Sequence, residues 1–273
     1  MRAAATQNPF VSVVTVSLNA AASIEDTIAS VAGQQAEFAV EHICVDGGST
    51  DGTRSIIDDW AARLNHIRHI YESDSGIFDA MNKGLRVARG EYVLFLNADD
   101  FLVAPNTLAI AMRGLVPESA TNPDLVVGNV HMGMPGTRGV WRRRDVPSLL
   151  GRLRRCGLYP PHQGMFAKRD VLDSVGGFDS RCRFAADIIQ YYDLDRRPKL
   201  SLRRIDTCVA FMRAGGAANS GLGAVYGGSA EIYLHLRPLV GTVKAATMVL
   251  VKSLQSMVEL RYGIPTAHRW FAS

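Results

Sequence analysis

The stretch "YVLFLNADD", residues 92–100, decides the fold. Residues 92–96 are all apolar or aromatic, and such a short continuous run is typical of a strand buried on both faces of a parallel sheet. The run ends in Asn97, Ala98, Asp99 and Asp100. Ligands of open α/β sheets bind beyond the carboxyl ends of the strands, so these residues predict a polar ligand at this edge.

Strand and helix patterns alternate on the N-terminal side of this stretch. Strands are expected at "VSVVTVS" (residues 11–17), within "HICVDGGSTDGT" (42–53) and at "IRHIY" (67–71). Apolar residues at helical spacing follow each of them: Ile24, Ile28 and Val31 behind an N-cap at Ser23; Ile56, Ile57, Trp60, Ala61 and Leu64; and Ile77, Met81, Leu85 and Ala88. Repeated βα units predict an α/β fold with a mostly parallel, three-layer sheet.

The second half of the chain has a different pattern. Strands are expected at residues 125–133, 136–144 and 205–213. Residues 162–179 are expected to form a strand, a helix and a glycine turn, and residues 184–197 a helix. The small-residue stretch 214–229 predicts a mobile loop, and the chain from Glu231 onward predicts a helix interrupted at Pro238. We therefore expect an α/β domain at residues 1–218 and a helical C-terminal extension at residues 219–273.

Composition and charge limit the compartment and the partners. The 273 residues are 47% hydrophobic and 21% charged, as in ordinary globular proteins. Residues 1–10 contain no apolar signal segment and the cysteines form no CxxC pair, so we expect a cytoplasmic protein with reduced thiols. Arginines crowd residues 142–204, which favours a polyanionic partner or a solvated basic face. Lys244 and Lys252 interrupt the apolar segment 239–260, so this helix is expected to pack on the domain or lie on a membrane surface.

Polar residues follow the expected strands at Asn19, Asp46, Asp74 and Asp99. These strand ends carry no GxGxxG, GxxxxGK[ST] or GxSxG motif, which argues against a dinucleotide-binding Rossmann fold, a P-loop NTPase and an α/β-hydrolase. On the polar face of the helix expected near residues 77–88, Lys83 would contact a phosphate and Asn82 a sugar hydroxyl. A solvated helix face is the alternative interpretation.

Two of the acids also have alternative interpretations. Asp46 precedes two glycines, and its carboxylate would either accept the imide N–H of a uracil-type base or form an Asx-turn that caps the next helix. Asp51 is the better capping candidate, which leaves Asp46 freer for a ligand. Asp99 would bind Mg²⁺ or Mn²⁺ together with substrate phosphates, or would merely begin a helix.

Six motifs occur in an order that resembles family 2 glycosyltransferases with the GT-A fold, of the kind found in bacterial polysaccharide and glycolipid biosynthesis. They are "VSVVTVSLNAAASIEDTIASV", "VDGGSTDGT", "DSGIFDAMNKG", "LNADD", "HQGMF" and "GGFDSRCRFAAD". The resemblance implies an enzyme that moves a sugar from a nucleoside diphosphate donor, most commonly a UDP-sugar, to a hydroxyl of a glycan or lipid-linked acceptor. It also implies Mn²⁺ or Mg²⁺ as the cofactor.

The resemblance assigns roles to particular residues. Asp187 would be the catalytic base of an inverting mechanism, although a helix-terminal acid is the alternative interpretation. Asp99 would be the metal ligand, and His162 and Gln163 would face the acceptor cleft. Nucleotide-sugar binding would involve Thr15, Ser17, Asn19, Asp46, Ser49, Asp74, Gly76, Asp79, Asn82, Lys83, Asn97, Ala98 and Asp99.

Two features depart from the family pattern. Asn97 replaces the first acid of the DxD motif, and Ile188 and Ile189 stand where relatives often have an aromatic residue and a further acid. A non-catalytic nucleotide-sugar-binding protein or scaffold therefore stays open as the alternative function. No nucleic-acid motif accompanies the arginines, so we expect no nucleic-acid partner. The basic middle and the amphipathic tail favour peripheral contact with the inner face of the cell membrane.

Overall fold

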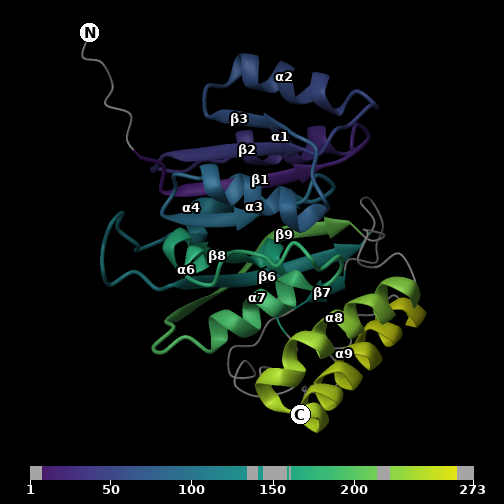
Figure 1. The fold of residues 1–273 in the computed structure, drawn as a ribbon. Helices are drawn as coiled ribbons and strands as arrows, with labels where there is room; N and C mark the ends of the chain where they lie inside the picture. The colour runs from purple at the N-terminus through teal and green to yellow at the C-terminus, as the bar shows by residue number, and fades with distance from the viewer. Residues whose placement is uncertain (1–7, 134–140, 144–158, 160, 214–221, 263–273) are drawn as a thin grey trace.

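The computed structural model describes residues 8–133, 141–143, 159, 161–213 and 222–262. Within them, one mixed sheet has the strand order β3-β2-β1-β4-β8-β6-β9-β5, and β7 pairs with β6 (Figure 1). The strands are β1 (Val11–Ser17), β2 (Val40–Asp46), β3 (Ile67–Tyr71), β4 (Tyr92–Phe95), β5 (Phe101–Leu102), β6 (Leu125–Gly133), β7 (Trp141–Arg143), β8 (Met165–Lys168) and β9 (Leu202–Arg213). The remainder of the strand expected at 136–144 lies outside the described residues.

The N-terminal half is the parallel part of the sheet that the sequence predicts. Strand β1 pairs in parallel with β2 and β4, and β2 pairs in parallel with β3. Every residue of β1 is buried because helices cover both of its faces. The helices packed on the sheet are α1 (Ile24–Ala32), α2 (Thr53–Arg63), α3 (Ile77–Val87), α4 (Thr107–Ala111), α6 (Arg169–Asp173) and α7 (Ala186–Asp195).

The second half extends the sheet with mixed pairing. Strand β8 pairs antiparallel with β4 and β6, whereas β6 and β9 run parallel. A 3-10 turn, η1 (His162–Gly164), leads into β8, and α6 follows at once. Gly176 and Gly177 then reverse the chain with φ values of 82° and 71°, a left-handed backbone that favours glycine. The predicted strand, helix and glycine turn within residues 162–179 is therefore confirmed.

Three details of the N-terminal half differ from the sequence-based expectation. The fourth strand ends at Phe95 rather than at Leu96. Ser23 precedes α1 as expected, but its side chain makes no capping hydrogen bond. Ile77 was expected in the buried stripe of α3 and is 37% exposed, because it is the first residue of that helix and lies at its open end.

The C-terminal segment corrects two predictions. Residues 222–229, expected to form a loop, are the first part of α8 (Leu222–Val240), while residues 214–221 lie outside the described part of the chain. Small residues suit this helix because it packs closely: a Cβ at Gly227 would lie 2.6 Å from the Phe184 ring. Pro238 lies inside α8 instead of interrupting it, and the break falls at Gly241, which has a φ of 84°.

Helix α9 (Thr242–Tyr262) folds back along α8, and both lie beside α7 (Figure 1). The Ser229 and Ser253 hydroxyls share a 2.7 Å hydrogen bond between the two helices. A cluster of buried side chains joins the hairpin to the start of α7: Ala185, Ile232, Leu236, Ala245 and Met248. The expectation that the apolar tail packs on the domain is confirmed. No helix in the described residues is long and apolar enough to cross a bilayer.

Candidate active site

The carboxylate of Asp46 lies at the end of β2 and is fully buried. Its Oδ1 accepts hydrogen bonds from the backbone N–H groups of Gly48 (3.1 Å) and Ser49 (2.9 Å), which is the geometry of an Asx-turn. Its Oδ2 accepts from the hydroxyls of Ser49 and Ser17, the latter at 3.2 Å. Asp46 therefore holds the turn after β2 in place.

Arg54 adds a charged partner to this network. Its Nε lies 3.0 Å from Asp46 Oδ1. Burial acts to raise the pKa of Asp46, but the hydrogen bonds from Ser49, Arg54 and Gly48 outweigh it and hold the pKa below its ordinary value. Asp51 does cap α2, accepting from Thr53 N at 3.1 Å. The expectation that this leaves Asp46 without local partners is wrong, because the tight glycine turn aims two backbone donors at it.

The loop after β1 is bonded to the same turn. Asn19 has a left-handed backbone (φ 52°), and its N–H donates to Ser49 Oγ at 2.7 Å. Its side-chain oxygen accepts from Thr50 N at 2.9 Å. Thr15 is not at this edge: it is fully buried inside β1, and its hydroxyl shares a 2.9 Å hydrogen bond with His42 Nε2. The structure thus joins Ser17, Asn19, Asp46 and Ser49 and excludes Thr15.

Asp74 follows β3 and lies against the same turn. A Cβ on Gly47 would stand 2.1 Å from Asp74 Oδ2, so only glycine leaves room for this carboxylate. Asp74 accepts from Gly76 N at 3.0 Å. Burial raises the pKa of Asp74, and the negative charges of Asp79 and Asp46 add to that effect. Two acids from different strand ends therefore share one small region.

Helix α3 uses its polar residues inside the protein rather than on a solvated face. Lys83 is buried, and its Nζ donates to Ser73 O at 2.5 Å and pairs with Glu72 at 2.9 Å and with Asp79 at 3.5 Å. Asn82 exchanges two hydrogen bonds with the backbone of Phe178, at 2.8 and 2.9 Å. Asn82 therefore anchors the glycine turn before α7, and its amide is already satisfied there.

The carboxylates of Asp99 and Asp100, which follow β4, have different surroundings. Asp100 points inward, where Gln163 Nε2 donates at 2.7 Å and Arg213 N at 3.1 Å. Burial and then the charge of Asp99 raise the pKa of Asp100 to about 7. Burial also raises the pKa of Asp99, but no other described residue donates a hydrogen bond to its carboxylate. Gln163 is buried at 2% exposure and supports Asp100, so it does not line an open cleft.

One histidine connects the end of β4 to the start of α7. His162 Nε2 lies 3.4 Å from Asn97 Oδ1, and His162 Nδ1 lies 3.5 Å from Asp187 Oδ2. Asp187 also accepts from Ile188 N at 2.8 Å. Burial acts to raise the pKa of Asp187, but His162, the Ile188 N–H and the charge of Lys252 together hold it below its ordinary value. Asp187 is therefore a partly exposed, ionised carboxylate beside the β4 strand end.

The sequence that builds these strand ends matches a known family. The sequence profile described as Glycosyl transferase family 2 matches residues 12–186. The chain belongs to glycosyltransferase family 2. A PGL/p-HBAD biosynthesis glycosyltransferase of Mycobacterium tuberculosis is 34% identical to it over 220 residues, covering 78% of this chain and 80% of that relative. A putative teichuronic acid biosynthesis glycosyltransferase, TuaG, of Bacillus subtilis is 46% identical over 93 residues, 34% of this chain and 36% of that protein.

Solved structures show the same fold. TarS 1–349 of S. aureus in complex with UDP-GlcNAc is 19% identical with a TM-score of 0.61, covering 91% of this chain and 72% of that one. The mannosyltransferase PcManGT of Pyrobaculum calidifontis, in complex with GDP-Man and Mn²⁺, is 20% identical with a TM-score of 0.59, covering 93% and 75%. The family 2 glycosyltransferase described here is thus an enzyme with the GT-A fold and a C-terminal helical region.

The family implies a divalent metal, and one residue fits it. Asp99 offers an ionisable carboxylate without a protein hydrogen-bond donor among the described residues, whereas Asp100 is already bonded. Mg²⁺ and Mn²⁺ commonly take one or two carboxylates and complete their shells with substrate phosphates and water. No cluster of three or more His, Cys, Asp or Glu in the described chain is arranged to hold a metal by itself. The residues therefore fit an ion that arrives with the substrate.

Sequence reasoning missed several residues of this glycosyltransferase site. Arg54 and Arg213 carry no motif signal, and their contacts with Asp46 and Asp100 appear only in three dimensions. Leu18 stands between Ser17 and Asn19 and is 59% exposed, which is unusual for a leucine at a strand end. Its position within the first sequence motif is the signal from which it could have been found.

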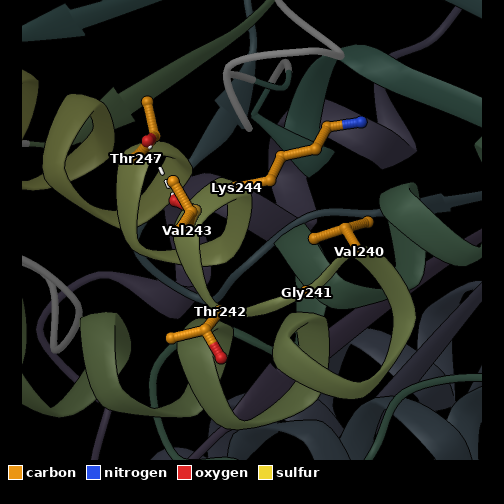
Figure 2. Close-up of a pocket in the computed structure, with 6 residues that line it drawn as sticks. All are labelled: Val240, Gly241, Thr242, Val243, Lys244 and Thr247. Atoms are coloured by element: carbon orange, nitrogen blue, oxygen red, sulfur yellow. Dashed lines mark hydrogen bonds between the residues drawn. The ribbon is translucent and has the colours of Figure 1, made fainter.

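A pocket of about 550 Å³ lies at the junction of α8 and α9 (Figure 2). Its lining residues are Val240, Gly241, Thr242, Val243, Lys244 and Thr247. None of them belongs to the strand-end site, and the carboxylates discussed above do not enter it. We therefore assign the chemistry of this glycosyltransferase to the strand ends and not to this pocket.

Proposed function

We propose that this family 2 glycosyltransferase catalyses inverting transfer from a nucleoside diphosphate sugar to a hydroxyl of a glycan or lipid-linked acceptor. The observation that carries the proposal is the bridge Asn97–His162–Asp187. It puts an ionised carboxylate next to the strand end that also carries Asp99. In this proposal the proton acceptor, Asp187, and the diphosphate-binding edge at Asp99 would lie on opposite sides of His162.

Asp187 is assigned the role of general base. As the acceptor oxygen forms a bond to the anomeric carbon, Asp187 takes the hydroxyl proton, and the bond from that carbon to the diphosphate oxygen breaks with its electron pair. A carboxylate base works only within hydrogen-bond reach of the proton that it removes. His162 and the Ile188 N–H fix the direction of the carboxylate, which supports this role.

The donor would bind at the loops after β1, β2 and β3. Asp46 would accept an imide N–H from the base, which suits UDP, and Asn19 and Ser49 would shape the ribose side. Asp74, Gly76, Asp79 and Lys83 would border the diphosphate and the donor sugar. The buried Lys83 supplies the positive charge of this region, and a phosphate would compete with Glu72 and Asp79 for it.

The metal would be Mn²⁺ or Mg²⁺, held on the protein side by Asp99 with Asn97 and Ala98 beside it. When bound, such an ion neutralises charge on the departing diphosphate. Asp99 is suited to this because no other residue of the described chain donates a hydrogen bond to its carboxylate. The PcManGT complex with Mn²⁺ has the same fold, which supports a divalent metal as the cofactor.

The acceptor side would face the membrane. Exposed apolar side chains occur on α8 and α9 at Leu234 (67%), Val243 (81%) and Leu250 (59%), and Lys244 lies among them. Apolar side chains flanked by lysines suit peripheral contact with anionic lipid. Flotation with anionic vesicles tests this part: the protein should float with them, and indifference to the vesicles would remove the membrane contact from the proposal.

A thermal-shift panel tests the donor half. UDP-glucose, UDP-GlcNAc and GDP-mannose are each added with and without Mn²⁺, because a ligand that binds the native state raises the melting temperature. We expect a UDP-sugar to stabilise the protein only when Mn²⁺ is present. If no nucleotide sugar stabilises it under either condition, the proposed donor site is wrong.

A further inference from the structure

The segment that leads into helix α7, which carries Asp187, is held by a side chain from another helix. The carboxylate of Glu231, in α8, accepts hydrogen bonds from the backbone N–H groups of Arg183 (2.7 Å), Phe184 (3.0 Å) and Ala185 (2.9 Å). Ala185 occupies the N-cap position of α7 and offers no side-chain cap. The three N–H groups belong to the N-cap residue and the two residues before it, so Glu231 holds the segment that leads directly into α7.

Packing keeps Glu231 in register with α7. Ile232 and Leu236 of α8 are buried against Ala185, and Ile188 is partly buried against the same cluster. Ile188, at the position where the resemblance implies an aromatic residue, is thus partly covered by the hairpin. At the far end of α7, His235 Nε2 lies 3.3 Å from Asp193 Oδ1. Helix α8 thus contacts α7 at both ends.

The charge of the hairpin also reaches Asp187. Lys252 of α9 is one of the groups that favour the ionised form of this carboxylate, together with His162 and the Ile188 N–H. Asp187 is the second residue of α7, so the direction of its side chain depends on the conformation of the first turn. Glu231 fixes the backbone of residues 183–185, from which that first turn starts.

We propose that Glu231 is a positioning residue for the catalytic base, and that the α8–α9 hairpin is a working part of the acceptor side of the active site. The inference rests on the proposed function, in which Asp187 is the base. A hairpin that served only as an anchor would not need a carboxylate aimed at the start of α7. Conversely, loss of this carboxylate should disturb Asp187 without touching the donor loops, which lie at the far ends of β1, β2 and β3.

The test compares Glu231→Ala with Glu231→Gln and with His235→Ala in the full chain. His235→Ala is the matched control because it removes an α8–α7 contact at the end of α7 that is distant from Asp187. Nucleoside diphosphate release from UDP-glucose, UDP-GlcNAc and GDP-mannose is measured with Mn²⁺, with water as the acceptor. Hydrogen exchange of the amides at residues 183–188 reports on this segment independently of turnover.

We expect Glu231→Ala to lower kcat by about ten- to a hundredfold, because a misplacement near 1 Å costs about that much. The KM for the donor and the thermal shift by UDP with Mn²⁺ should stay within twofold, and exchange at 183–188 should rise. Glu231→Gln, which keeps an acceptor oxygen, should recover part of kcat. In the Asp187→Asn background, Glu231→Ala should lower the residual rate much less, because the base that it positions is gone.

Different outcomes overturn different conclusions. If Glu231→Ala raises exchange but leaves kcat unchanged, or if His235→Ala lowers kcat equally, the residue is a structural anchor and the inference fails. The inference also fails if Glu231→Ala lowers the rate by the same factor in the Asp187→Asn background as in the wild type. Absence of release from every donor by the wild-type protein would overturn the proposed function and the inference together.

Discussion

The proposed donor side and the proposed acceptor side of this glycosyltransferase are built from contacts of different range. On the donor side, Asp46 takes its partners from Gly48, Ser49 and Arg54, all within the same loop and helix start. On the acceptor side, Asp187 depends on His162 and Lys252, and its helix depends on Glu231. The turn that holds Asp46 is closed mainly by residues close to it in sequence, whereas the surroundings of Asp187 are assembled from segments farther apart in the chain.

This difference has a mechanical consequence. A turn closed by its own backbone donors keeps its shape whenever the sheet is folded. A helix start that is held by a distant helix keeps its shape only while that helix is docked. We therefore expect the donor side to tolerate changes in the C-terminal hairpin and the acceptor side to be sensitive to them.

The largest expected effect is that of Asp187→Asn. The amide keeps the size of the side chain but cannot accept the acceptor proton, and general bases contribute about 10²- to 10⁴-fold to rate. Nucleoside diphosphate release should fall by about 10³-fold, while stabilisation by UDP with Mn²⁺ should persist. Retained turnover in this variant would remove Asp187 from the mechanism and leave the donor side as the better understood half.

The same contrast in range explains what the sequence predicted. The strand at residues 11–17, the strand at 67–71 and the polar strand ends follow from local patterns, and the structure has these strands at those bounds. The resemblance assigned Thr15 to the nucleotide, but in the structure its buried hydroxyl points to His42. Neither Glu231 nor Arg54 belongs to a recognisable motif, and α8 was expected to begin nine residues too late because its glycines resemble a loop until Phe184 is seen against Gly227.

Asp99→Asn should produce the second largest effect and should act on the donor side alone. Loss of the carboxylate that would hold Mn²⁺ is expected to cost about a hundredfold in turnover, or about 3 kcal/mol of transition-state stabilisation. Titrating Mn²⁺ at fixed UDP in a thermal-shift assay measures the loss of metal binding, and nucleoside diphosphate release measures the loss of turnover. Without Mn²⁺, UDP should give the variant and the wild type the same small or absent thermal shift, and a full Mn²⁺ response in the variant would place the metal elsewhere.

The core beneath the donor side should be sensitive to acid through His42. Burial, and then the charge of His66, lowers the pKa of His42 to about 3, and its Nδ1 is buried without a hydrogen-bond partner in the described chain. Below pH 6.5, His42 binds a proton in the unfolded chain but stays neutral in the folded chain until the pH approaches 3. The contribution of neutral His42 to the free energy of unfolding is therefore complete above pH 6.5. It falls by up to about 1.4 kcal/mol per pH unit as the pH drops toward 3.

Urea unfolding at pH 7 and pH 5 measures this dependence. His42→Gln should reduce the loss of stability between the two pH values, because glutamine does not titrate. His69→Gln, on the neighbouring strand with a side chain 39% exposed, serves as the matched control and should leave the loss unchanged. An identical pH dependence in wild type and His42→Gln would show that the acid sensitivity arises outside this core.

The smallest effect tests whether Asp46 is an anchor, a ligand-binding group or both. Arg54 is 44% exposed, so removing its ion pair should cost at most about 1 kcal/mol of stability. Arg54→Ala also frees an acceptor position on Asp46, which uracil can use through its imide N–H and cytosine cannot. The ratio of UDP to CDP affinity, measured by titration calorimetry with Mn²⁺, should rise about threefold, which is under 1 kcal/mol. Arg63→Ala, on the same helix but stacked on Trp60, should leave the ratio unchanged. A ratio that stays constant in Arg54→Ala would mean that Asp46 shapes its turn and does not read the base.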